Sequence, residues 1–143
     1  MNKFSEKIKR RAQELQEQIV RDRRALHQIP EIGMDLPRTC AYVEKQLDEM
    51  GIPWKECGGE LPGKMTQDFV EAGFPKMERA VGVTAVIGKG SPCILLRADM
   101  DALPIQEEND LEFKSCNGLG HMCGHDSHTA MLLGAARILK EME

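Results

Sequence analysis

The sequence predicts a single layered α/β domain in which a mixed, largely buried sheet is flanked by helices. Three observations support this fold class. The chain of 143 residues has the length of one domain. Apolar residues at helical spacing open and close the chain, and β-branched runs lie between them. The composition, 41% hydrophobic and 29% charged, is typical of a folded globular protein and excludes a disordered chain.

Two amphipathic helices are expected in the first third of the chain. Apolar residues recur at helical spacing from Phe4 to Leu26, and Pro30 sets the limit of this first helix. The second helix is expected to begin near Pro37 and to end before Gly51, because proline favours the first helical turn and glycine the C-terminal cap.

The middle of the chain is expected to hold the sheet. Residues 52–57 predict one strand, and the runs VGVTAVIG, ending at Gly88, and CILLRAD, residues 93–99, predict two adjacent antiparallel strands. Residues 58–80 are expected to be an insertion loop with a short helix from about Thr66 to Ala72. A polar connection over 105–120 and a helix from Ser127 to Met142 complete the prediction.

Charge and cysteine content limit the partners and the compartment. The net charge is −4, although residues 1–29 hold eight Lys or Arg against four Asp or Glu. With one Trp and one Tyr, the chain lacks the stacking aromatics of a nucleic-acid binder. No apolar run reaches the ~18 residues of a membrane span. Five cysteines without a secretory signal predict a reducing, cytoplasmic location.

Two clusters of side chains predict chemistry. The first is Asp99 and Asp101, which follow an apolar run and share one face if that run is a strand. The second is the segment from His121 to His128, which holds three of the four histidines. Imidazole and thiolate are ligands that suit zinc and similar divalent cations. The candidate ligating and orienting residues of this segment are His121, Cys123, His125, Asp126 and His128.

Three interpretations of the second cluster remain open from the residues alone. It is half of a catalytic metal centre, a closed zinc site, or a thiol nucleophile, Cys123, with a histidine base. A closed site would use Cys116, His121, Cys123 and His125, but the single-residue gaps on either side of Cys123 are shorter than those of structural zinc sites.

The motifs resemble those of a known family. LRADMDALPI followed by GHMCGHDSHTAMLLGAA, with RRALHQIPEIGMDLPRT upstream, is similar to the signature of the di-metal amidohydrolases that include hippurate hydrolase, N-acyl-amino-acid aminoacylase and the auxin–amino-acid conjugate hydrolases. The resemblance covers roughly residues 20–57 and 82–142. It implies that residues 1–143 are the N-terminal part of a metallopeptidase catalytic domain, without the lid and dimerisation domain.

The resemblance also implies roles for individual residues. Cys123 and His125 would bind metal, with Asp99 and Asp101 in support. His121, Asp126 and His128 would orient the ligands. The complete enzyme would hold two divalent ions, Zn²⁺ or Mn²⁺ first and Co²⁺ or Ni²⁺ as alternatives. Its general-base glutamate has no counterpart here, because none of the late glutamates matches that motif: Glu107, Glu108, Glu112, Glu141 and Glu143.

The function expected from this resemblance is metal-dependent hydrolysis of the amide bond of N-acyl amino acids or small peptides. Because the base and the later ligands are missing, the chain by itself is expected to be inactive, and to self-associate or to dock a missing C-terminal portion. The alternative is a non-catalytic metal-binding or interaction module that reuses the opening of the fold.

Overall fold

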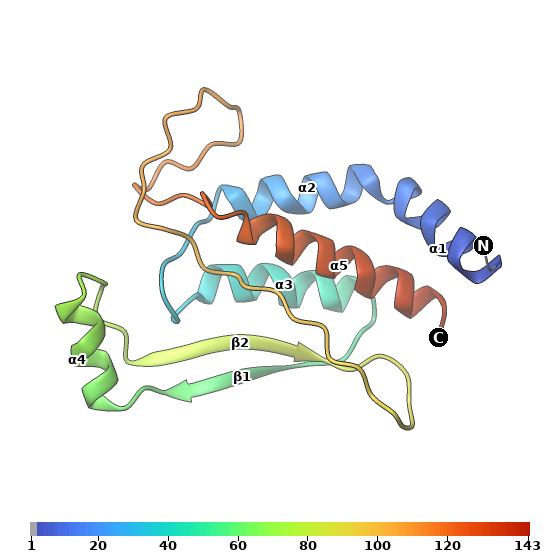
Figure 1. Ribbon diagram of the computed structural model, residues 1–143, viewed down its shortest axis with the longest axis horizontal. Helices are drawn as coiled ribbons and strands as arrows, with labels where there is room; N and C mark the ends of the chain where they lie inside the picture. The colour runs from blue at the N-terminus through green and yellow to red at the C-terminus, as the bar shows by residue number, and fades with distance from the viewer. Residues whose placement is uncertain (1–2) are drawn as a thin grey trace.

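The computed structural model describes residues 3–143 and confirms the α/β class. Its elements are α1 (Lys3–Glu14), α2 (Gln16–His27), α3 (Pro37–Glu49), β1 (Trp54–Glu60), α4 (Gly63–Glu71), β2 (Arg79–Ala85) and α5 (His125–Glu141). Helices α2, α5 and α3 lie as one layer above the two strands, and α4 joins the strands at one end of the molecule (Figure 1).

The expected opening helix is present with a bend at Leu15. The chain is helical as α1 and α2 on either side, and the amide of Leu15 still donates to Arg11 O at 3.0 Å. Leu15 is 8% exposed, whereas α1 buries no residue. The apolar periodicity therefore predicted the helix, and the bend accompanies the burial of Leu15 where the chain enters the core.

The core lies between α3, α5 and the strands. Val43 and Leu47 of α3 pack with Ile52 and with Leu133 of α5, and partly buried side chains of both strands join them. Val43 and Leu47 are four positions apart and therefore lie on one face of α3. Gly51, just beyond the helix, has φ +65°, the left-handed conformation that glycine adopts readily at a helix end.

Helix α5 packs closely on α2. Leu26 of α2 and Ala130 of α5 are 1% and 0% exposed. A Cβ atom at Gly134 would lie 2.7 Å from Cδ1 of Ile19, so the glycine allows the two helices to approach at this point. This contact brings the last turn of α2 beside the first turn of α5, where most of the histidines lie.

The sheet is smaller and more exposed than the sequence predicted. β1 and β2 form a two-stranded antiparallel hairpin, with Trp54 opposite Ala85 and Glu60 opposite Arg79. Every residue of both strands is exposed or half-buried. The short helix expected within 58–80 is present as α4.

The predicted strand over 93–99 does not form. These residues have no strand partner in the described chain, and Ile94 and Leu95 are 83% and 87% exposed. β2 pairs instead with β1, which lies upstream. An apolar run needs a neighbouring backbone for its hydrogen bonds before it becomes a strand, and sequence alone does not supply that neighbour.

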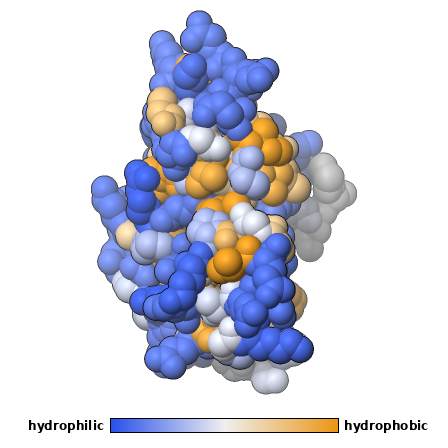
Figure 2. Space-filling view, turned by 90° about the vertical axis from the view of Figure 1, so that its left-hand side faces the viewer, coloured by the Kyte–Doolittle hydropathy of each residue, from blue (hydrophilic) through white to orange (hydrophobic). Residues whose placement is uncertain are grey.

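The surface at the α4 end is mainly polar. Figure 2 shows hydrophilic side chains above and below a band of hydrophobic surface on this face. Over residues 3–143 the longest apolar helical stretches fall short of what crossing a bilayer requires.

Candidate metal centre

Three backbone hydrogen bonds bring the two predicted clusters together. The amide of Ala102 donates to Glu31 O at 2.7 Å, beyond the end of α2. Leu103 and Gly120 exchange amide–carbonyl bonds of 3.0 Å in both directions. The acidic segment 99–101 is thereby held between the end of α2 and the histidine-rich segment that leads into α5.

Asp99, His125 and His128 form a group of metal-ligating side chains. One ligand atom from each lies within 4.8 Å of the other two. Asp99 and His125 are half-buried and His128 is exposed. The two imidazole rings stack with their centroids 5.5 Å apart, as expected for residues three positions apart on the first turn of α5. Three of the seven predicted site residues therefore offer ligand atoms to one group.

Asp101 orients the ring of His125. Nδ1 of His125 lies 3.0 Å from the carboxylate Oδ1 of Asp101 and 3.0 Å from its carbonyl oxygen. Both oxygens accept hydrogen bonds, so Nδ1 is engaged with Asp101 and Nε2 is the nitrogen of this ring that is available to a cation. A histidine that donates from one nitrogen to a carboxylate and binds metal with the other is a common arrangement. The supporting role expected of Asp101 fits this geometry.

Asp99 is held by its backbone and by an exposed ion pair. The hydroxyl of Thr129 donates to the carbonyl oxygen of Asp99 at 3.0 Å, which ties the acidic segment to α5. The carboxylate pairs with Arg97, whose side chain is 76% exposed. Exposed ion pairs contribute about 0–1 kcal/mol. A cation could therefore replace the guanidinium beside Asp99 at small cost.

Cys123 and His121 lie outside this group. Cys123 is an exposed free thiol, separated from His125 by Gly124, whose φ of +88° is a left-handed conformation that glycine adopts readily. His121 is 6% exposed, and neither of its ring nitrogens has a hydrogen-bond partner among the described residues. Burial lowers the pKa of His121, which favours its neutral form.

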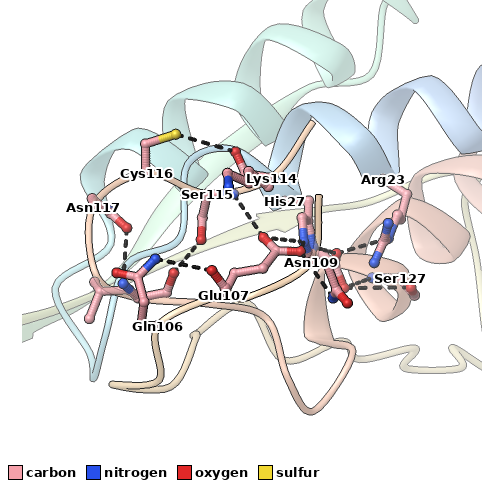
Figure 3. A network of polar contacts seen from close by, with 12 residues as sticks. Arg23, His27, Gln106, Glu107, Asn109, Lys114, Ser115, Cys116, Asn117 and Ser127 are labelled. Carbon is pink, nitrogen blue, oxygen red and sulfur yellow. Dashed lines mark hydrogen bonds and ion pairs between the residues drawn. The ribbon is translucent and has the colours of Figure 1, made fainter. Parts of the chain in front are cut away.

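Asp126 takes part in a buried network that sequence reasoning missed. Its Oδ2 lies 2.6 Å from Nδ1 of His27 and 2.9 Å from Nε of Arg23. Nε2 of His27 lies 3.1 Å from both carboxylate oxygens of Glu107, which also accepts the amide of Ser115 at 2.8 Å. Figure 3 shows Glu107 reaching between Ser115 and His27. The histidine that Asp126 contacts is His27, which lies 99 residues away in the sequence.

The donor set fits a divalent cation. A carboxylate and two imidazoles are ligands that Zn²⁺ and Mn²⁺ accept. Asp101 contacts Nδ1 of His125, which leaves Nε2 of that ring as the nitrogen available to a cation. Three protein ligands with one of them exposed leave room for further groups, which is typical of open rather than closed sites.

Comparison with known proteins relates this segment to a family. The model for peptidase family M20/M25/M40 matches residues 95–143, which contain both clusters. Residues 95–143 are thus similar to the M20 peptidase family.

M20 relatives extend the similarity to most of the chain. It is 43% identical over 121 residues to IAA-amino acid hydrolase ILR1-like 5 of Arabidopsis thaliana, covering 83% of this chain and 23% of that protein. It is 39% identical over 138 residues to an N-acyl-L-amino acid amidohydrolase of Geobacillus stearothermophilus, covering 96% and 32%. The chain therefore spans between about a quarter and a third of the length of these relatives.

A solved M20 structure shares the fold. A Bacillus subtilis protein described as a dinuclear metal binding peptidase from this family superimposes with a TM-score of 0.64 at 28% identity. The match covers 91% of this chain and 32% of the other. The resemblance drawn from the sequence motifs is thus confirmed at the level of family and fold.

Proposed function

We propose that this chain contributes part of a metal centre for hydrolysis of the amide bond of N-acyl amino acids or small peptides. The observation that carries the proposal is the meeting of Asp99, His125 and His128, with Asp101 orienting His125, inside the segment that matches the M20 family. The names of the relatives, amidohydrolases and a carboxypeptidase, support the reaction class.

Divalent cations in such a centre lower the pKa of a water molecule and polarise the scissile carbonyl. The chain's own residues have a simpler task, which is to present ligand atoms in a fixed arrangement. His125 offers Nε2 because Asp101 contacts Nδ1. Asp99 neutralises positive charge, and the first turn of α5 carries both imidazoles.

We further propose that residues 1–143 bind metal but do not hydrolyse substrate on their own. Glu107 is a carboxylate buried between His27 and Ser115, and it does not belong to the group around Asp99. A general base must reach the proton that it takes, within about 3 Å or through one water.

The five free thiols support a reducing, cytoplasmic setting for the protein.

Metal content measured by elemental analysis tests the proposal. The purified chain is loaded with Zn²⁺ or Mn²⁺ and dialysed, and bound metal per chain is compared among single alanine variants. We expect His125→Ala to abolish binding, and the exposed Cys93→Ala to leave it unchanged as the matched control. Loss of bound metal in His128→Ala would identify His128 as a ligand, as the geometry of the group indicates. Loss of bound metal in Cys123→Ala would identify Cys123 as a ligand, as the family motif implies.

Other results would contradict parts of the proposal. Metal binding that survives His125→Ala, or that is absent from the wild type, would refute the metal centre. Loss on Cys116→Ala together with His121→Ala would identify the closed zinc site instead. Hydrolysis of N-acetyl amino acids by the loaded wild type that is lost in Cys123→Ala would show that the chain is a complete catalyst.

A further inference from the structure

His27 is a buried titratable side chain to which the proposed reaction gives no role. It is the last residue of α2 and is 4% exposed. Its ring lies between two carboxylates, with Nδ1 2.6 Å from Asp126 and Nε2 3.1 Å from both oxygens of Glu107. Phe113 packs its ring edge-on against it, with the centroids 5.8 Å apart. The ring is therefore held on both sides by charge and on one face by packing.

Two acidic side chains face the two nitrogens of this ring, Asp126 at Nδ1 and Glu107 at Nε2. Arg23 places a positive charge 2.9 Å from Asp126. The ring and the guanidinium together supply the polar partners of both buried carboxyl groups. Removing one member of such a network leaves an uncompensated buried charge, which is strongly destabilising locally.

The two carboxylates belong to different segments of the chain. Asp126 is the second residue of α5 and lies between His125 and His128 in sequence. Its Oδ1 accepts the amide of Ser127 at 2.8 Å, so its side chain is tied to the backbone of that first turn. Glu107 accepts the amide of Ser115, which ties it to the 105–120 connection. His27 thus links α2, the connection and the start of α5.

We propose that His27 is a positioning residue, which holds the first turn of α5 and the 105–120 connection in the arrangement where His125 and His128 meet Asp99. The significance of this arrangement for metal binding rests on the proposed function. The positioning itself rests on the contacts of His27 with Asp126 and Glu107, neither of which belongs to the group of ligating atoms.

Two measurements on the full chain test the proposal with His27→Gln. The first is titration with Co²⁺ followed by its visible absorption, which reports the affinity and the ligand geometry. Groups that orient metal ligands change affinity by about 10–100-fold when replaced, and we expect a loss at the lower end of that range. The second is amide hydrogen exchange without metal, in which we expect faster exchange at Ser115, Ser127 and His128 and little change at Leu133 in the middle of α5.

Tyr42→Phe is the matched control. The Tyr42 hydroxyl donates to Asp22 of α2 at 2.9 Å, so this variant also removes a hydrogen bond that α2 makes through a partly buried side chain. We expect it to lower stability without changing Co²⁺ affinity or exchange at the start of α5. All variants are compared at a temperature at which circular dichroism shows them folded. Glu107→Gln, which keeps the shape of the side chain but removes its charge, serves where His27→Gln does not fold.

The outcomes separate the two proposals. Unchanged exchange at Ser127 and His128 in His27→Gln would overturn the positioning role, as would a Co²⁺ affinity and spectrum equal to those of the wild type. An equal loss of Co²⁺ affinity in Tyr42→Phe would show that His27→Gln acts only by lowering overall stability, and this too would overturn the positioning role. If the wild type binds no Co²⁺, the proposed function is wrong, and the exchange measurement alone decides whether His27 positions the turn.

Discussion

Glu107 is a carboxylate that this protein keeps charged although it is 3% exposed. Burial by itself would raise the pKa of Glu107. The amide of Ser115 and the ring of His27 donate to its oxygens and outweigh burial, so that its pKa lies below the ordinary value of 4.5. The charged form is therefore part of the folded structure.

The lowered pKa of Glu107 predicts a pH dependence of stability. A carboxyl group whose pKa is lower in the folded state contributes stability that is fully present above about pH 4.5 and is lost as the pH falls through the folded value. We expect Glu107→Gln to lower the free energy of unfolding at pH 7 by about 1–3 kcal/mol, because the charged hydrogen bonds are lost. The difference from the wild type should shrink at acid pH.

Urea denaturation at a series of pH values measures this difference. Glu78→Gln is the control, because Glu78 pairs with Lys76 on the exposed surface and its pKa is also lowered, by the hydrogen bond from Lys76. We expect that control to follow the wild type closely, since exposed pairs contribute little. A Glu107→Gln curve that also follows the wild type at every pH would show that the network is not a source of stability.

Local sequence patterns predicted part of the site, and the remaining part depends on contacts between residues far apart in the sequence. The spacing of His125 and His128 before an apolar helical stripe predicted one face of a helix, and Asp99 with Asp101 marked the partner segment. His27 pairs with Asp126 across 99 residues and with Glu107 across 80. No periodicity connects residues at such separations, so this network becomes visible only in the folded chain.

At the scale of elements, the β1–β2 hairpin depends on one close backbone approach. Gly58 has φ +116°, and a Cβ atom there would lie 2.1 Å from the carbonyl oxygen of Ala80. Both the conformation and the distance require glycine. The sequence showed glycines at this point but no partner strand, so it predicted a strand over 52–57 and a loop from residue 58, whereas β1 continues to Glu60.

Gly58→Ala is expected to disrupt the hairpin. A residue forced into a sparsely populated conformation costs about 1–3 kcal/mol, and the clash with Ala80 adds to that cost. Thermal unfolding followed by circular dichroism measures the loss. Gly63→Ala is the control, because a Cβ atom at Gly63, which opens α4, would meet no atom within 4 Å. We expect that control to change stability by no more than about 0.5 kcal/mol. Equal melting temperatures for the two variants would contradict this account.

Helices were predicted better than strands for a physical reason. A helix closes its hydrogen bonds within a short stretch of sequence, so α3 and α5 follow from their own apolar stripes and from residues such as Pro37 and Gly51. A strand closes its hydrogen bonds with another segment. Residues 93–99 have the composition of a buried strand, but β2 pairs with β1 instead, and the pattern could not reveal this.

At the scale of the molecule, the most exposed apolar segment predicts self-association. Ile94 and Leu95 are 83% and 87% exposed, and their backbone has no strand partner in the described chain. Contiguous exposed apolar residues on an unpaired backbone favour edge-to-edge association. We therefore expect the chain to form dimers or larger species as its concentration rises.

Sedimentation velocity at increasing concentration tests this expectation. The double variant Ile94→Lys/Leu95→Lys should shift the chain toward monomer, because a charge on an exposed edge opposes pairing. Met131→Lys, at a 56% exposed position on α5, is the control and should leave association unchanged. A wild type that stays monomeric at every concentration would exclude the segment as an association site.

The packing of α2 against α5 also determines when the chain can complete its fold during synthesis. A ribosome adds about 5–20 residues per second, so about 5–20 seconds pass between the synthesis of His27 and that of Asp126. During that interval the apolar side of α2 has been made and its partner has not. The helical layer is therefore completed late, when α5 leaves the ribosome and packs against the apolar side of α2.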